Sequence, residues 1–292
     1  MNDFVLAIVT QSLTFMPLAL GISISYHILR ATDMTIDGSF VVGAAVFARL
    51  LTLGFSPGMA TVFALCCGAL AGFLTALIQR GGKVDPLLAG VLATFILSSV
   101  NLVVMGQPNI NLLSQTTLVS EAFEKNEILG WLLVSFYTLL ICASTFLLLK
   151  TRFGLTLRAF GDNPSLLERL GKRIEFYRLA GFALTNLLAA AAGCLTAQTV
   201  GYADVGMGFG MTLTGIGAII LGQQMIRRVH GNNYLRIGLE FFACLLGVLF
   251  YFFSLNSLLR LDINPVYLKM ILGLVLIIFL RAAHRFSAVR AK

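Results

Sequence analysis

The polar side chains best placed to do chemistry in this chain stand beside long apolar runs, and the first group is the segment from Asp33 to Ser39, DMTIDGS. Two carboxylates at the start of an apolar helix are costly unless they are solvated, paired or capping. Either Asp37-Gly38-Ser39 breaks the helix, so that free amides line a cavity, or Asp33, near Arg30, caps a helix at an interface. The first interpretation makes four residues candidates for a pore or gate: Asp33, Thr35, Asp37 and Ser39.

Three amide side chains lie inside apolar segments, at Asn101, Asn186 and Gln198. In a membrane, Asn and Gln often join helices by hydrogen bonds and have no further role. The alternative is that they line the same pore or gate. Both interpretations stay open on the residues alone.

A second informative stretch, TRFGLTLRAFGDNPSLLERLGKRIE, covers residues 151–175. Gly161 is free to take a positive φ and turn the chain. Asp162 or Asn163 is suited to cap a helix whose first residue is Pro164, because proline is favoured at that position. The pattern predicts a short helix between two longer apolar segments.

Leu166, Leu167 and Leu170 give this short helix an apolar stripe at helical spacing. One interpretation is a helix that docks in the groove of a soluble partner. The other is an interfacial helix that only anchors the connection. The residues alone favour neither.

The elements that position these residues follow from composition. Of 292 residues, 58% are hydrophobic and 12% are charged, and the mean hydropathy is +0.90. Soluble domains carry roughly a quarter charged residues, so lipid must be the solvent of most of this surface. We therefore expect an all-α fold, a polytopic membrane helical bundle that forms a single membrane domain over residues 1–292.

Spanning helices need about 20 apolar residues, and nine segments meet this condition. The seventh is rich in glycine, which predicts a broken or re-entrant helix. The expected segments are 4–29, 35–54, 57–79, 86–105, 128–149, 177–199, 207–226, 234–256 and 265–281.

The net charge of +8 resides mainly in short loops, above all from Lys150 to Arg178, and not in a patch with interleaved aromatics. This distribution argues against nucleic acid as a partner. Loops rich in Lys and Arg face the cytoplasm. Counting nine segments, we expect the N-terminus outside and the C-terminus in the cytoplasm, with residues 150–176 forming a cytoplasmic loop.

Enzyme signatures are missing from the sequence. It contains neither GxxxxGK[ST] nor HExxH, and its three histidines are dispersed. Its five cysteines show no CxxC spacing. We expect no catalytic residues, no metal site and no cofactor in this chain, which favours a conduit over a catalyst.

Four stretches together resemble the permeases of ABC importers of the branched-chain amino acid and ribose group, most closely those for tryptophan or tyrosine uptake. They are RFGLTLRAFGDNPSLLERLG, GFALTNLLAAAAGCLTAQTVGYADVGMGFGMTLTGIGAIILGQ, TDMTIDGSFVVGAAV and PLLAGVLATFILSSVNLVVMG. The resemblance extends from about residue 12 to residue 280. It implies that the loop after the fifth segment holds a coupling helix that receives the stroke of the ATPase.

Carried over by resemblance, the coupling role falls on Leu157, Arg158, Gly161, Asp162, Asn163, Pro164, Leu166 and Leu167. This chain continues with Leu170-Gly171-Lys172, where members usually have a small residue and Gly-Ile. The departure leaves the identity of the ATPase partner open.

The resemblance further implies a multi-pass protein of the bacterial inner membrane, surrounded by lipid. Its partners would be a second permease copy, most simply as a homodimer, two ABC ATPase subunits that hold ATP and Mg²⁺, and a periplasmic solute-binding protein. The binding protein would dock on outer loops, or else these charges are merely solvated; the candidates are Glu121, Glu124, Asp204 and Arg260. The implied cargo is a small solute, an aromatic or other amino acid.

Two rival classes remain on the residues alone. A secondary transporter or channel that works without ATP would need ion-coupling residues at mid-membrane, which are scarce here. A membrane-embedded enzyme would need an acid–base or metal cluster. The expected fold is common to all three classes.

Overall fold

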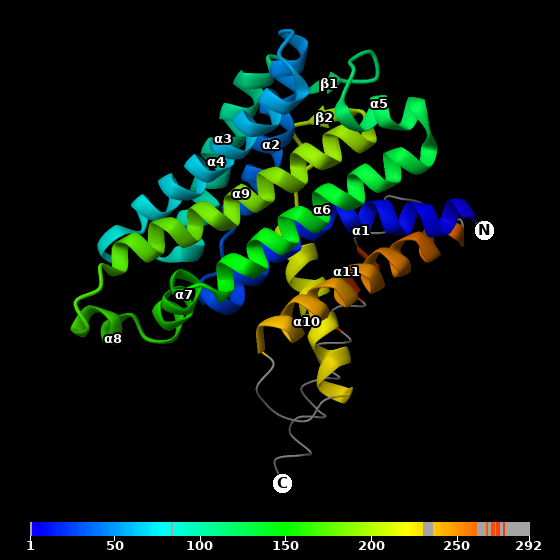
Figure 1. Cartoon of the computed structure of the whole chain (residues 1–292). Helices are drawn as coiled ribbons and strands as arrows, with labels where there is room; N and C mark the ends of the chain where they lie inside the picture. Colours follow the sequence, from blue (N-terminus) through cyan, green and yellow to red (C-terminus); the bar gives the residue numbers. More distant parts are fainter. Residues whose placement is uncertain are drawn as a thin grey trace. The chain divides into compact units, whose positions relative to one another are not determined.

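The computed structural model describes residues 2–82, 84–229 and 236–261, with six single positions between 267 and 277 (Figure 1). The chain divides into two compact units, one formed by Leu13–Gly215 and the other by Met1–Ser12 with Ile216–Lys292. In chain order the elements are α1 (Asn2–Ser23), the π-helical turn η1 (Ile24–Ile28), α2 (Thr35–Thr52), α3 (Pro57–Ile78), the 3₁₀ turn η2 (Arg80–Gly82), α4 (Pro86–Met105), β1 (Asn109–Asn111), α5 (Leu118–Lys125), α6 (Glu127–Lys150), α7 (Arg152–Asp162), α8 (Pro164–Arg169), α9 (Ile174–Val200), β2 (Tyr202–Asp204), α10 (Met211–Val229) and α11 (Arg236–Arg260).

Within the described residues, seven helices are long and apolar enough to cross a membrane. They match the first six expected segments and the eighth: Phe4–Ile28, Thr35–Thr52, Pro57–Ile78, Pro86–Met105, Glu127–Lys150, Ile174–Val200 and Gly238–Arg260. The expected all-α, polytopic class is therefore confirmed. Most of the ninth expected segment, 265–281, lies outside the described residues.

The break expected at Asp37-Gly38-Ser39 is wrong, because α2 runs without interruption from Thr35 to Thr52. Asp37 directs its carboxylate to a distant segment and does not compete for the amides of its own helix. Gly38 serves packing, since a Cβ there would lie 2.9 Å from the Cβ of Leu97 in α4.

The seventh expected segment, 207–226, starts later than predicted. Turns occupy residues 205–210, and helix α10 begins only at Met211. Gly210 has a φ of +79°, and a Cβ on Gly208 would lie 2.2 Å from the carbonyl oxygen of Asp37. The glycines thus form a close-packed turn that precedes the helix in the sequence. A break within the helix was expected instead.

Helix α9 packs against α2 and α3 in the larger unit, as Figure 1 also shows. Between α2 and α9, a Cβ on Gly43 would lie 2.0 Å from the carbonyl oxygen of Ala190, and one on Gly193 would lie 1.9 Å from that of Phe40. In lipid, small residues of this kind drive helix association by letting backbones approach closely.

Gly68 and Gly72, spaced four residues apart on α3, face α9. A Cβ on Gly68 would lie 2.3 Å from the Cβ of Ala190, and one on Gly72 would lie 2.1 Å from the carbonyl oxygen of Phe182. Helix α9 is therefore in backbone contact with two neighbours, and its position is fixed by glycines on both.

In the smaller unit, glycines also bring the backbones of α10 and α11 into contact. A Cβ on Gly222 would lie 1.8 Å from the carbonyl oxygen of Ala243, and one on Gly247 would lie 1.9 Å from that of Ala218. In the same unit, Asn256 donates a hydrogen bond of 2.8 Å to the side-chain oxygen of Gln11.

One short antiparallel ribbon links the segments that follow α4 and α9. Strands β1 and β2 pair Asn109 with Asp204 and Asn111 with Tyr202. Ile110 and Ala203, at the centre of the ribbon, are buried in an apolar cluster with the C-terminal half of α2. The ribbon therefore holds one end of α2, α4 and α9 together.

We predict that Gly43→Val will destabilise the folded protein by about 1–3 kcal/mol or more, because the new side chain collides with backbone atoms that cannot move away. The matched control is Gly58→Val, since a Cβ at Gly58 meets nothing within 4 Å. Melting curves of the two variants in detergent measure the difference. Equal melting temperatures would contradict the packing described for α2 and α9.

Candidate functional site

A buried polar cluster joins α2 and α9. Asp33, Ser39 and Asn186 are all inaccessible to solvent. The side-chain amide of Asn186 donates to Oδ2 of Asp33 (2.7 Å), and the Ser39 hydroxyl donates to Oδ1 of Asn186 (2.6 Å). Oδ1 of Asp33 accepts the backbone N–H of Thr35 at 2.9 Å, at the start of α2. Three of the predicted pore or gate candidates thus meet in one network, which we call the Asp33 cluster.

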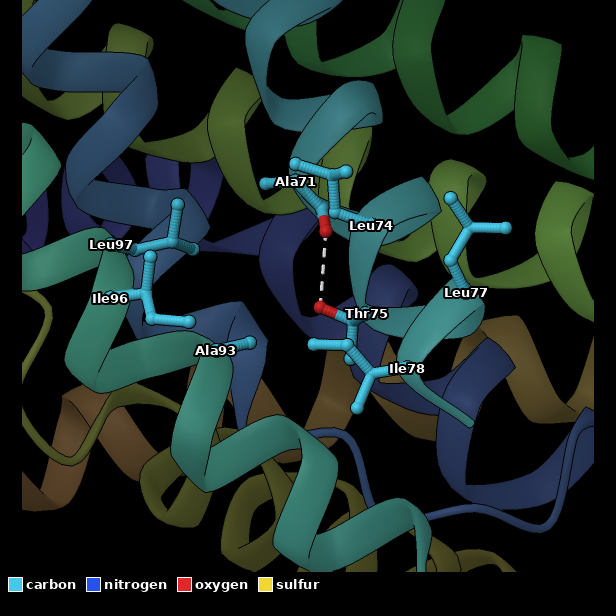
Figure 2. Close-up of a pocket in the computed structure, with 8 residues that line it drawn as sticks. All are labelled: Ala71, Leu74, Thr75, Leu77, Ile78, Ala93, Ile96 and Leu97. Carbon is cyan, nitrogen blue, oxygen red and sulfur yellow. Dashed lines mark hydrogen bonds between the residues drawn. The ribbon is translucent and has the colours of Figure 1, made fainter. Parts of the chain in front are cut away.

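Thr35 extends the Asp33 cluster to α3. Its hydroxyl lies 3.0 Å from that of Thr75, which also bonds to the carbonyl oxygen of Ala71 at 3.0 Å (Figure 2). Sequence reasoning missed Thr75. The signal was available, since Gly68, Gly72 and Thr75 follow one another on a single helical face.

Thr75 also lines a cavity of about 410 Å³ between α3 and α4 (Figure 2). The other lining side chains are apolar: Ala71, Leu74, Leu77, Ile78, Ala93, Ile96 and Leu97. Because the Thr75 hydroxyl is already bonded within the protein, the cavity offers hydrocarbon contacts only. Such a lining suits an apolar chain and not the charged groups of an amino acid.

Asp33 is the only carboxyl of the cluster. Burial raises the pKa of Asp33 above its ordinary value of 3.8, and the hydrogen bonds from Thr35 and Asn186 offset only part of that rise. Although Arg30 is near Asp33 in the sequence, its guanidinium forms an ion pair with Asp162 of α7. Asp33 is therefore held by neutral donors alone within this network.

A raised pKa in the folded state makes the Asp33 contribution to stability greatest below pH 3.8 and lost as the pH rises through the folded-state pKa. We predict that the melting temperature of the natural chain, relative to Asp33→Asn, will fall as the pH is raised from about 4 toward about 7. Because both proteins share every other carboxyl, the difference isolates Asp33. A difference that stays constant over this range would contradict the raised pKa.

The two remaining amide candidates lie apart from the cluster. Asn101 of α4 donates to the carbonyl oxygen of Gly38 at 3.2 Å and so joins α4 to α2. Gln198 lies twelve residues beyond Asn186, which is about 18 Å along α9. Its amide nitrogen contacts the sulfur of Cys194 at 3.5 Å, and its buried Oε1 has no hydrogen-bond partner among the described residues.

Asp37 caps a helix other than its own. Its carboxylate accepts the backbone N–H groups of Gly210 (3.0 Å) and Thr212 (2.6 Å) and the Thr212 hydroxyl (2.6 Å). These amides belong to the start of α10, where a negative charge is favoured by the helix dipole. Asp37 therefore fixes the glycine turn and the first residues of α10, up to Thr212, to the first turn of α2. Thr212, which sequence reasoning missed, carries no local signal for this contact.

Asp37→Ala is predicted to speed hydrogen exchange of residues 205–215 by about two- to thirtyfold, since losing an N-cap costs about 0.5–2 kcal/mol. Asp85→Ala is the matched control, because Asp85 caps α4 through the N–H of Leu87. The control should speed exchange at the start of α4 and leave 205–215 unchanged. Unaltered exchange of 205–215 in Asp37→Ala would contradict the capping role.

The segment after α6 folds as two helices, α7 and α8. The predicted cap is confirmed: Asn163 accepts the N–H of Leu166 at 3.2 Å, and Pro164 is the first residue of α8. The turn predicted at Gly161 is wrong, because Gly161 lies inside α7. The positive φ belongs to Gly171, after α8, at +72°.

The leucine stripe of α8 divides between two environments. Leu167 is buried, as is Leu157 of α7, so both hold the segment to the rest of the larger unit. Leu166 is 50% exposed and Leu170 is 65% exposed. Arg158 is partly exposed. Two large apolar side chains are thus exposed, one on α8 and one on the residue that follows it, while Leu167 on the same helix is buried.

The outer-loop candidates make contacts of different kinds. Glu121 of α5 is exposed and bonds Lys125 at 2.7 Å, which lowers the pKa of Glu121, and Glu124 is also exposed. Asp204 accepts the N–H of Gly206 at 2.7 Å in its own turn and the side-chain amide of Asn109 at 3.3 Å across the ribbon. Arg260 belongs to the other unit and stacks over the ring of Phe4.

No group of three His, Cys, Asp or Glu side chains that could hold a metal ion occurs in the described part of the chain.

The fold defines an all-α, polytopic membrane protein with a buried polar cluster and an amphipathic helix pair. The chain belongs to the family described as the permease component of the branched-chain amino acid transport system, which it matches over residues 4–280.

Relatives cover nearly the whole chain. It is 45% identical to the uncharacterized protein RP368 of Rickettsia prowazekii, over 98% of this chain and 99% of that protein. It is 34% identical to a tyrosine transport system permease protein of Clostridioides difficile, over 96% of this chain and 91% of the relative. It is 28% identical to the autoinducer 2 import system permease protein LsrC of Escherichia coli, over 70% and 59%. No solved structure matches.

The protein is therefore a permease subunit of an ABC importer, a multi-pass protein of the bacterial inner membrane. Membership in this family favours the ABC permease over the secondary transporter and the membrane enzyme that the residues alone left open. It implies ATPase and binding-protein partners.

Proposed function

We propose that two copies of this chain form the pathway by which an amino acid, in the first place an aromatic one, enters the cell. Two ATPase subunits, which bind ATP and Mg²⁺, dock on α8 at the cytoplasmic face. A periplasmic binding protein delivers the solute to the opposite face. The observation that carries this proposal is the exposure of Leu166 in α8 and of Leu170 directly after it, in a segment that buries Leu157 of α7 and Leu167 of α8.

The geometry of the helices supports opposite faces for the two kinds of partner. Helix α6 has 24 residues, or about 36 Å, and α9 has 27, or about 40 Å; each is long enough to cross a bilayer. Helices α7 and α8 lie between the end of α6 and the start of α9, so they share one side. Helix α5 and strand β2, at the other ends, share the opposite side.

Charge supports the cytoplasmic assignment of α7 and α8. This connection carries Arg152, Arg158, Arg169, Lys172 and Arg173, whereas α5 carries Glu121 and Glu124 with one lysine. Positive charge accumulates in short cytoplasmic loops. Glu121, Glu124 and Asp204 then face the periplasm, where we propose that the binding protein docks. With nine spanning segments in one permease domain, the N-terminus is periplasmic and the C-terminus cytoplasmic.

The substrate class is proposed from the relative named as a tyrosine transport system permease. The cavity between α3 and α4 does not supply a site for the charged groups of an amino acid. We place the pathway along the interface between two permease copies, with ATP binding changing the relative stability of inward- and outward-open states.

Replacing both exposed leucines by aspartate, as Leu166→Asp/Leu170→Asp, is predicted to lower the yield of copurified ATPase by at least about tenfold, because it puts charge into an apolar contact. The matched control is Leu113→Asp, which changes an 81% exposed leucine on the proposed periplasmic side. Native-operon expression followed by affinity purification measures the yield. Equal recovery from both variants would contradict docking on α8.

A further inference from the structure

A π-helical turn ends the first membrane helix. In η1 the N–H of Leu29 bonds to the carbonyl oxygen of Ile24 at 2.9 Å, five residues back. Such turns are rare and occur frequently at functional sites. The next residue, Arg30, has a φ of +53°, the only positive value at a non-glycine position among the described residues. A strained conformation of this kind persists only where its surroundings hold it.

Helix α7 is seated directly on this turn. A Cβ on Gly161 would lie 1.7 Å from the carbonyl oxygen of Ile28, so only glycine permits the contact. The next residue, Asp162, forms an ion pair with the guanidinium of Arg30. The close approach to the Ile28 carbonyl explains why a glycine stands at position 161 within α7. The ion pair with Asp162 explains why Arg30 does not pair with Asp33.

The π-helical turn also touches α9. A Cβ on Gly181 would lie 2.6 Å from Cδ2 of Leu29 and 3.2 Å from Cδ1 of Leu157. The Leu29 side chain therefore sits where α7 and α9 approach each other. Displacement of α7 would act on packed atoms and not on a loose loop.

The connection to the Asp33 cluster is short. Only Ala31 and Thr32 separate Arg30 from Asp33, a span of about 10 Å at full extension. The Ser25 hydroxyl bonds the carbonyl oxygen of Ala31, and the N–H of Ala31 bonds the carbonyl oxygen of Ser25 at 3.1 Å. Arg30 is therefore joined, by a short and hydrogen-bonded segment, to the carboxylate that ties α2 to α9.

We propose that Arg30 is a positioning residue for coupled transport: through Asp162 it passes movement of α7 to the π-helical turn and on to the Asp33 cluster. This inference rests on the proposed docking of the ATPase on α8. Both side chains of the ion pair are more than 60% exposed. Exposed pairs of this kind contribute little to stability, so the expected effect of breaking it is on coupling and not on folding.

The test uses the complex of permease and ATPase, with hydrogen exchange of residues 29–40 measured with and without ATP plus vanadate. In the natural complex, exchange of 29–40 is expected to change when nucleotide is trapped. Arg30→Glu and Asp162→Arg should each abolish that change, and Arg30→Glu, which lies outside the proposed docking segment, should do so while the ATPase still copurifies and hydrolyses ATP. The double variant R30E/D162R and the conservative Arg30→Lys should restore it.

Three results would overturn the inference. They are a nucleotide-dependent change that survives in both single variants, a loss that neither the double variant nor Arg30→Lys restores, and no change in the natural complex. Absence of the ATPase from the natural complex would instead contradict the proposed function. The two failures are therefore distinguishable.

Discussion

A carboxylate buried between membrane helices is the constraint on which the larger unit depends. Asp33 is removed from solvent, and its oxygens are held by Asn186 of α9 and by the first amide of α2. Unpaired, such a group would cost several kcal/mol. The cluster therefore fixes where α2 begins, which face of α9 it meets and, through Thr35 and Thr75, how α3 joins them. A second carboxylate, Asp37, fixes the start of α10 to α2 by accepting the N–H of Thr212.

Close packing at glycines holds the helices together in addition to these polar contacts. Lipid supplies no hydrophobic force between helices, so association depends on van der Waals contact and interhelical hydrogen bonds. Glycines on α2 and α3 bring α9 to backbone contact on two sides. Glycine in α7 does the same against the π-helical turn. Helix α9 is therefore closely packed between its neighbours, and it connects the side that carries α8 to the side that carries β2.

Features encoded by neighbouring residues were predictable from the sequence. The apolar runs correctly predicted seven of the membrane-spanning helices, and Asn163-Pro164 correctly predicted the start of α8. Gly161 was misjudged because its requirement is the nearby carbonyl of Ile28, 133 residues away in the chain. Asp37 was misjudged for the same reason, since its partners lie at 210 and 212. Long-range contacts of this kind leave no local pattern, and only the folded chain reveals them.

One arrangement is central to the proposed function: the ATPase contacts α8, and α5 lies across the membrane from it. A photo-crosslinking amino acid placed at position 166 or at position 124, in cells that express the native operon, tests this directly. Irradiation is expected to join the permease to the ATPase subunit from position 166 and not from position 124. A crosslink to the ATPase from position 124, with none from position 166, would contradict the account.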